Sequence, residues 1–166
     1  QKNFEIFIKA SEYLYKNNIL KFNTYIFGSG ENKEKLEQLI RKYHLEKNIF
    51  LMGSKKNIHK YYSLSKLFIL TSLWEDPGFV LIEAALNDIP IISSNCKNGP
   101  KEFLMDGKAG LLFENNEDDG LLKKLKEFKK LETKEIFEKK VLAKKNSKEF
   151  TMFRHFLGLK KVIGQI

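Results

Sequence analysis

Short apolar runs alternate along this chain with longer segments in which apolar and polar residues are mixed. Continuous apolar runs near residues 22–27, 49–52, 67–71, 89–93 and 110–113 are typical of buried strands. The segments between them, where apolar residues tend to recur three or four positions apart, are predicted helices at residues 2–18, 31–45, 57–65, 77–87 and 99–107. This alternation predicts an α/β fold: a Rossmann-like doubly wound parallel sheet with helices on both faces.

The two ends of the chain complete the pattern. After Glu114 the sequence is rich in lysine and is predicted to be helical to its end, with breaks near Thr133 and Asn146. Sheets of this kind usually open on a central strand, whereas this chain opens on a helix. Either a strand precedes Gln1, where it is expected to lie between the strands at 22–27 and 67–71, or the fold is truncated.

Composition narrows the class of protein. With 166 residues and 42% hydrophobic content, the chain can bury one core but is short for two domains. Its net charge of +9 favours an anionic partner, such as a phosphate ligand, nucleic acid or acidic lipid, or else reflects a solvated lysine-rich surface. The single cysteine, Cys96, fits a reducing compartment and is expected to be packed rather than reactive. No apolar run approaches 18 residues and no signal-peptide layout is visible, so a cytoplasmic location is expected.

Candidate binding loops follow from the predicted sheet. Ligands of doubly wound sheets bind beyond the carboxyl ends of the strands, in loops that lead into helices. This rule selects residues 28–32, 53–57, 72–78 and 93–100, all rich in Gly, Ser, Asn or Pro.

The third of these loops carries the most specific chemistry. In "TSLWEDPGFVLIEAAL", Pro77 and Gly78 begin a helix whose first amides, at Gly78, Phe79 and Val80, form a ready anion site. Glu83 lies one turn further in and could accept hydrogen bonds from a ribose. Glu75, before the helix, could meet whatever lies beyond the phosphates.

Spacing alone does not establish this site. The same separation of acids recurs at Glu127 and Glu135, inside a lysine-rich helix where both are expected to be solvated. The alternative interpretation is an ordinary surface acid for Glu83 and a loop charge for Glu75. The surrounding order of apolar strand, Pro-Gly helix start, apolar helix and apolar strand favours the site.

Four segments together resemble a known family. "WEDPGFVLIEAA", "YIFGSGE", "IFLMGSKKNIHKYYSLSKLFILTS" and "IPIISSNCKNGPKEFLMDGKAGLLFE" occur in the order found in the C-terminal, donor-binding domain of retaining glycosyltransferases of family 4, which have the GT-B fold. The resemblance covers roughly residues 2–125. It implies a nucleotide-sugar (donor) binding domain at 1–130 and C-terminal helices of the same domain at 131–166, contacting an N-terminal domain.

The resemblance implies a role for particular positions. Glu83 corresponds to the glutamate that holds the donor ribose, and Glu75 to the one beside the transferred sugar; these are the two residues expected to be catalytic. The backbone of Gly78, Phe79 and Val80 corresponds to the phosphate- and sugar-binding segment.

Further donor-binding positions are implied in the same way. Lys2 corresponds to a lysine that neutralises the diphosphate, with Asn3 replacing the usual glycine and a companion arginine expected ahead of Gln1. The remaining implied positions are Gly28 and Gly30 in the glycine turn, Gly53, Ser54 and Lys55 at the base, and Asn98, Gly99, Pro100 and Glu102 in a "GPxE" variant. The residues alone allow another interpretation of each position. Lys2 could equally be a solvated lysine, and Gly28 and Gly30 could simply form a tight turn. Glu102 could only support the start of a helix.

The implied reaction is retaining transfer of a sugar to an acceptor hydroxyl of a growing glycan or lipid-linked saccharide. The expected donor is a UDP-sugar, with a GDP-sugar as the alternative. No cofactor is expected, and no metal, since there is no Asp-x-Asp motif. The expected partners are the nucleotide sugar, the acceptor, the enzyme's own N-terminal acceptor domain and a peripheral membrane surface, without nucleic acid. The fragment alone is expected to be inactive.

Other functions compete with this one. A sugar-nucleotide epimerase could use the same fold, and a basic nucleic-acid-binding domain could use the charge, although no module signature is present. A dinucleotide-dependent dehydrogenase is disfavoured because Lys33 stands where the third glycine of its motif would be. The scattered His44, His59 and His155 are expected at the surface or at helix ends.

Overall fold

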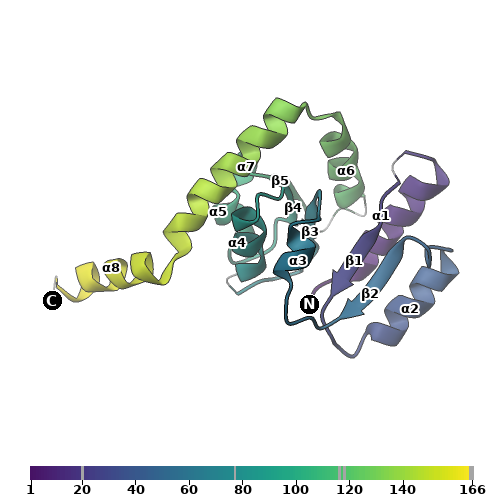
Figure 1. Cartoon of the computed structure of the whole chain (residues 1–166), viewed down its shortest axis with the longest axis horizontal. Coiled ribbons are helices and arrows are strands. Elements are labelled where there is room, and N and C mark those ends of the chain that lie inside the picture. Colours follow the sequence, from purple (N-terminus) through teal and green to yellow (C-terminus); the bar gives the residue numbers. More distant parts are fainter. Residues whose placement is uncertain (20, 77, 116, 118, 165–166) are drawn as a thin grey trace.

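The computed structural model describes residues 1–166 except residues 20, 77, 116, 118, 165 and 166 (Figure 1). Helices and strands alternate as the sequence predicts. The strands are β1 (Thr24–Phe27), β2 (Ile49–Gly53), β3 (Phe68–Leu70), β4 (Ile91–Ser94) and β5 (Leu111–Phe113). The helices are α1 (Phe4–Lys16), α2 (Lys33–Lys42), α3 (His59–Tyr62), α4 (Phe79–Leu86), α5 (Pro100–Phe103), α6 (Gly120–Lys130), α7 (Thr133–Ser147) and α8 (Met152–Ile163), with short 3-10 helices η1 (Met105–Gly107) and η2 (Lys148–Phe150).

All strand pairs in the described chain are parallel, which confirms the predicted fold class. Strands β1 and β2 pair with each other, and β3, β4 and β5 form a second sheet in that order. The expectation of one continuous sheet is therefore wrong for the described residues. The sheet is interrupted because β1 and β3 are not hydrogen-bonded to each other. This agrees with the expectation that these two strands are not direct neighbours.

The two faces of the sheets are covered by different helices. Consecutive residues of β4 point to opposite faces: Ile92 joins a core cluster with α1, α2 and α6, whereas Ile91 joins a second cluster with α3, α4, α5 and α7. The first cluster also contains Ile26 of β1 and Leu111 of β5, so one core connects both sheets. Strand β4 is buried on both faces, as a central strand of a doubly wound fold must be.

The lysine-rich C-terminal part consists of three helices. A capping box formed by Glu132 and Glu135 separates α6 from α7, which agrees with the predicted break near Thr133. The second break, predicted near Asn146, lies at residues 148–151, since α7 continues to Ser147 and α8 starts after the N-cap Thr151. Helix α7 packs against α4 through the buried Ala143, whereas α8 extends away from the body of the molecule (Figure 1).

The close packing between β4, α5 and β5 predicts the effect of one substitution. A Cβ atom added at Gly110 would lie 2.9 Å from the carbonyl oxygen of Ile91 and 2.9 Å from a methyl group of Leu104. We expect Gly110→Ala to lower the free energy of unfolding by about 1–3 kcal/mol, the usual cost of overpacking. Urea unfolding followed by circular dichroism measures this. Gly30→Ala is the matched control, since nothing lies within 4 Å of its Cβ position. An unchanged midpoint for Gly110→Ala would contradict the packing described here.

Candidate functional site

The centre of the candidate site is an ion pair between the chain's second residue and the loop after β3. The ammonium of Lys2 lies 2.7 Å from Oε1 of Glu75, and the hydroxyl of Ser72 donates a hydrogen bond to the same oxygen. Glu75 is 5% exposed, whereas the Lys2 side chain is 43% exposed. A buried carboxylate requires such partners, and the half-exposed ammonium leaves positive charge open to a ligand.

Hydrogen bonds fasten the surrounding segments to this ion pair. The Thr71 hydroxyl donates to the Lys2 carbonyl at 2.7 Å, and the Leu73 amide donates to the Gln1 carbonyl at 2.9 Å. Below the loop, Ser94 of β4 and Asn115 both donate to the carbonyl of Ser72, at 2.6 and 2.9 Å. The chain start and the ends of β3, β4 and β5 therefore meet beside Glu75.

The helix that follows begins at Phe79, with Gly78 as its N-cap, whereas the predicted start included Gly78 and Pro77, and Pro77 lies outside the described residues. Gly78 precedes α4 with φ of 80°, a left-handed conformation that favours glycine. The first turn of α4 contains the amides of Phe79 and Val80, and the Phe79 side chain is 62% exposed. The free amides of a first turn point out of the positive end of the helix, so this end can bind an anion.

Glu83 lies in the second turn of α4 and has a partner that sequence analysis missed. The hydroxyl of Tyr62, on α3, donates a hydrogen bond to Glu83 Oε2 at 3.1 Å. Burial, followed by the nearby charge of Glu83, raises the pKa of Tyr62 above its ordinary value. The hydroxyl therefore remains protonated, and remains a donor, at neutral pH.

The glycine loops after β1 and β2 lie side by side. The amide of Gly28 donates to the carbonyl of Gly53 at 3.0 Å, and both residues have positive φ, of 124° and 65°. Gly30 is exposed and has ordinary backbone geometry; Ser54 and Lys55 follow β2 and are exposed. The structure thus joins two of the loops that sequence analysis selected.

The loop after β4 joins the loop after β3 through the backbone. Trp74 and Lys97 form an isolated bridge, and the Glu75 amide donates to the Lys97 carbonyl at 3.2 Å. Beyond this bridge lies a hollow of about 620 Å³, lined by residues 95–99, 101, 102 and 106. Asn98 and Gly99, with φ of 64° and 111°, and Glu102 therefore lie together at one open hollow, whereas Pro100 is buried and does not line it.

Cys96 lines this hollow and is buried, as expected for a packed thiol. Burial raises the pKa of the Cys96 thiol, and the nearby Glu75 raises it further, although a hydrogen bond with Ser94 opposes the shift. The thiol is therefore neutral at pH 7. Among the histidines, His44 follows α2 with φ of 56°, and His59 is exposed on α3; the side chain of His155 lies outside the described part.

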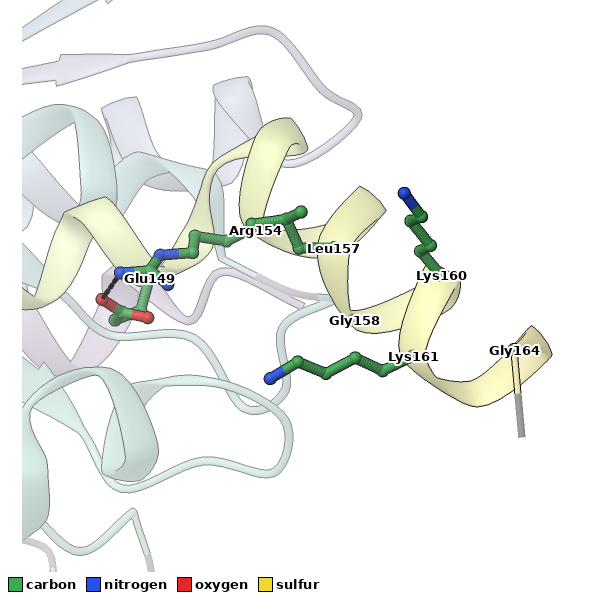
Figure 2. Close-up of a pocket in the computed structure, with 7 residues that line it drawn as sticks. All are labelled: Glu149, Arg154, Leu157, Gly158, Lys160, Lys161 and Gly164. Carbon is green, nitrogen blue, oxygen red and sulfur yellow. Dashed lines mark ion pairs between the residues drawn. The ribbon is translucent and has the colours of Figure 1, made fainter.

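A second hollow, of about 570 Å³, lies on α8 and contains none of the predicted site residues (Figure 2). Arg154 pairs with Glu149 there at 3.3 Å, while the side chains of Lys160 and Lys161 leave the helix in different directions (Figure 2). Within the described residues, no helix is both long and apolar enough to cross a membrane. The same part of the chain shows no cluster of three or more His, Cys, Asp or Glu suited to a metal ion.

Comparisons with known proteins agree on one family. Residues 1–150 match the family described as glycosyl transferases group 1. The chain is 33% identical over 125 residues to poly(ribitol-phosphate) alpha-N-acetylglucosaminyltransferase of Staphylococcus aureus, a match that covers 75% of this chain and 25% of that protein. It is 34% identical over 117 residues to the amylovoran biosynthesis glycosyltransferase AmsD of Erwinia amylovora, covering 70% of this chain and 32% of that protein.

Solved structures give the same result. A crystal structure of a mutant of S. aureus TarM, in complex with Fondaparinux, alpha-GlcNAc-glycerol and UDP, superposes with a TM-score of 0.76 at 30% identity. The match covers 87% of this chain and 29% of that chain, and the fold is that of GT-B glycosyltransferases. The chain thus spans about a third or less of the length of each of these relatives.

The ion pair at the centre of the site predicts how its partners affect stability. In Lys2→Met, the buried Glu75 loses its cation, so we expect the free energy of unfolding to fall by about 1–2 kcal/mol, less than for a fully buried pair because Lys2 is half exposed. The double variant Lys2→Met/Glu75→Gln should regain most of this loss, since no charge is then left buried. Chemical denaturation measures all three proteins.

The matched control is Lys35→Met, which removes an exposed ion pair with Glu5 of similar length, 2.8 Å. We expect it to change stability by less than about 0.5 kcal/mol. Equal effects of Lys2→Met and Lys35→Met would show that the Glu75 carboxylate does not depend on Lys2.

Proposed function

This chain belongs to the glycosyl transferases group 1 family, and we propose that it forms the donor-binding part of a retaining glycosyltransferase of family 4. In this proposal the enzyme transfers a sugar from a nucleotide-diphosphate sugar to an acceptor hydroxyl. The observation that carries the proposal is the set of groups at the start of α4: the Lys2–Glu75 pair comes from the loop before the helix, and Glu83 follows the first turn along the chain.

Each part of the donor has a matching group in this arrangement. Glu83 accepts hydrogen bonds from the ribose, and the first-turn amides of Phe79 and Val80 bind the diphosphate. Glu75 lies beyond these amides, beside the sugar. The loops at Gly28 and at Gly53, Ser54 and Lys55 are proposed to border the base, since they end β1 and β2 at the same edge.

Lys2 has two tasks in this proposal. Without a donor it compensates the buried Glu75 at 2.7 Å, and with a donor its exposed ammonium also faces the negative diphosphate. Departure of the diphosphate through an oxocarbenium-like transition state is then stabilised by the amides and by Lys2, which are already oriented. The donor is proposed to bind without a divalent metal, and a UDP-sugar is favoured because TarM was solved with UDP.

The acceptor is proposed to be a growing glycan or a lipid-linked saccharide, held by an N-terminal domain of the same enzyme. Relatives support this class, since the S. aureus protein is named for poly(ribitol-phosphate) and AmsD for amylovoran. A cytoplasmic location, at the inner face of the membrane, stays a prediction from the sequence.

Donor binding is tested by calorimetric titration of the full chain with UDP. We expect binding without added magnesium, and Glu83→Ala should weaken it by about 10- to 150-fold, the effect of losing one charged hydrogen bond of roughly 1.5–3 kcal/mol. Glu127→Ala removes a solvated acid on α6 and should leave affinity unchanged. Undiminished affinity in Glu83→Ala, or an absolute need for magnesium, would argue against the proposal. Transfer rather than isomerisation of the sugar by the complete enzyme separates it from an epimerase.

Membrane contact is a second part of the proposal, carried by α7. This helix exposes Phe137 and Val141, 61% and 47% accessible, among many lysines. We expect the complete enzyme to co-sediment weakly with acidic lipid vesicles at low salt through lysines between positions 123 and 148, and not with neutral vesicles.

A triple substitution separates a localised contact from overall charge. Replacing the exposed Lys134, Lys145 and Lys148 by Gln should weaken co-sedimentation. Replacing the exposed Lys33, Lys42 and Lys47 of the α2 region removes the same charge elsewhere and should preserve it. Equal partitioning onto acidic and neutral vesicles, or none onto either, would contradict the membrane contact. The positive charge would then serve solubility alone.

A further inference from the structure

Tyr62 occupies a position that packing alone does not explain. Its ring is buried between α3 and β3, with its centroid 6.0 Å from that of Phe68, and it belongs to the same core cluster as Leu81 and Ala84 of α4. A phenylalanine would fill the same space. The hydroxyl, however, donates a hydrogen bond to Glu83 Oε2 at 3.1 Å. No other hydrogen bond of this hydroxyl is found in the described part of the chain.

This hydrogen bond restrains a side chain that would otherwise be mobile. Glu83 is partly exposed, and a glutamate has three rotatable side-chain bonds whose freedom is lost when it binds a ligand. Tyr62 can hold one carboxylate oxygen because its own ring is fixed by packing on the core. The second oxygen, Oε1, is then presented in a defined direction.

The hydrogen bond also connects two elements that are far apart in sequence. Tyr62 belongs to α3, between β2 and β3, whereas Glu83 belongs to α4, between β3 and β4. Any ligand held by Glu83 therefore depends on the placement of α3 as well as of α4. The neighbouring Tyr61 points to a different partner, the ring of Phe27, at 4.7 Å between centroids.

We propose that Tyr62 is a positioning residue for the donor site: its hydroxyl fixes the Glu83 carboxylate in the orientation that accepts the ribose hydroxyls. The inference rests on the proposed function, because it assumes that Glu83 binds a nucleotide ribose. Tyr62 itself does not contact the donor and acts through Glu83. The hydroxyl stays protonated at neutral pH because burial raises its pKa, so the restraint persists under the conditions of binding.

A double-mutant cycle on the full chain tests this role. UDP affinity is measured by calorimetry for the wild type, Tyr62→Phe, Glu83→Ala and the double variant, below the onset of thermal unfolding of each. We expect Tyr62→Phe to weaken UDP about three- to tenfold, the scale of the rotamer freedom of one glutamate. In the Glu83→Ala background the same change should have no effect, because the group that Tyr62 positions is gone.

Two controls separate positioning from a general structural effect. Tyr61→Phe removes the hydroxyl of the adjacent residue, for which no hydrogen bond is found among the described residues, and should not alter affinity. With 2′,3′-dideoxy-UDP as the probe, which lacks the ribose hydroxyls, Tyr62→Phe and wild type should bind equally.

The outcomes distinguish the inference from the proposed function. If Glu83→Ala weakens UDP but Tyr62→Phe does not, the positioning role is overturned and the proposed function stands. A loss in Tyr62→Phe that persists in the Glu83→Ala background also overturns it, since Tyr62 then acts independently of Glu83. Absence of UDP binding to the wild type, or no effect of Glu83→Ala, overturns both.

Discussion

The buried charge of Glu75 is the constraint around which this end of the molecule is organised. A carboxylate that is 5% exposed is costly unless it is paired, and here the Lys2 ammonium and the Ser72 hydroxyl converge on one of its oxygens. Lys2 can pair with Glu75 only if the first residues of the chain lie against the end of β3. The bonds from Thr71 and Leu73 to the carbonyls of Lys2 and Gln1 hold them there.

The same constraint places the candidate site. Because all strands of each sheet are parallel, their carboxyl ends point in one direction and their following loops lie along one edge. Glu75 comes from the loop after β3, and its amide bonds to Lys97 in the loop after β4. Glu83 stands on α4, one turn beyond the helix start that this loop leads into. An anionic ligand at this start would meet a partly exposed cation, helix amides and a restrained acid, a set that the sequence disperses over more than eighty positions.

Local patterns predicted much of this arrangement. The alternation of apolar strands and helices gave the element order and the parallel sheets, and Pro-Gly before an apolar helix predicted the start of α4 near Gly78. Glu75 and Glu83 were assigned from the same segment, because their relation to a single loop and helix is local. The break near Thr133 was predictable for the same reason, since the capping box spans Glu132 to Glu135.

What remained hidden depends on contacts between distant segments. The Lys2–Glu75 pair joins residues 73 positions apart, so no spacing rule indicates it, and Lys2 is one of 30 basic residues. The bond from Tyr62 to Glu83 requires the packing of α3 against α4, and the only local signal is a buried aromatic on a four-residue helix. The continuous sheet was predicted wrongly because strand pairing depends on which strands become neighbours, which apolar content does not specify.

The central claim is that a nucleoside diphosphate binds at the start of α4, between Glu75 and Glu83. A crystal structure of the chain grown with UDP tests it most directly. The account predicts density for the ribose beside Glu83 and for the diphosphate at the amides of Phe79 and Val80, with Lys2 nearby. Density for UDP in the hollow on α8, or on any surface away from the start of α4, would contradict it.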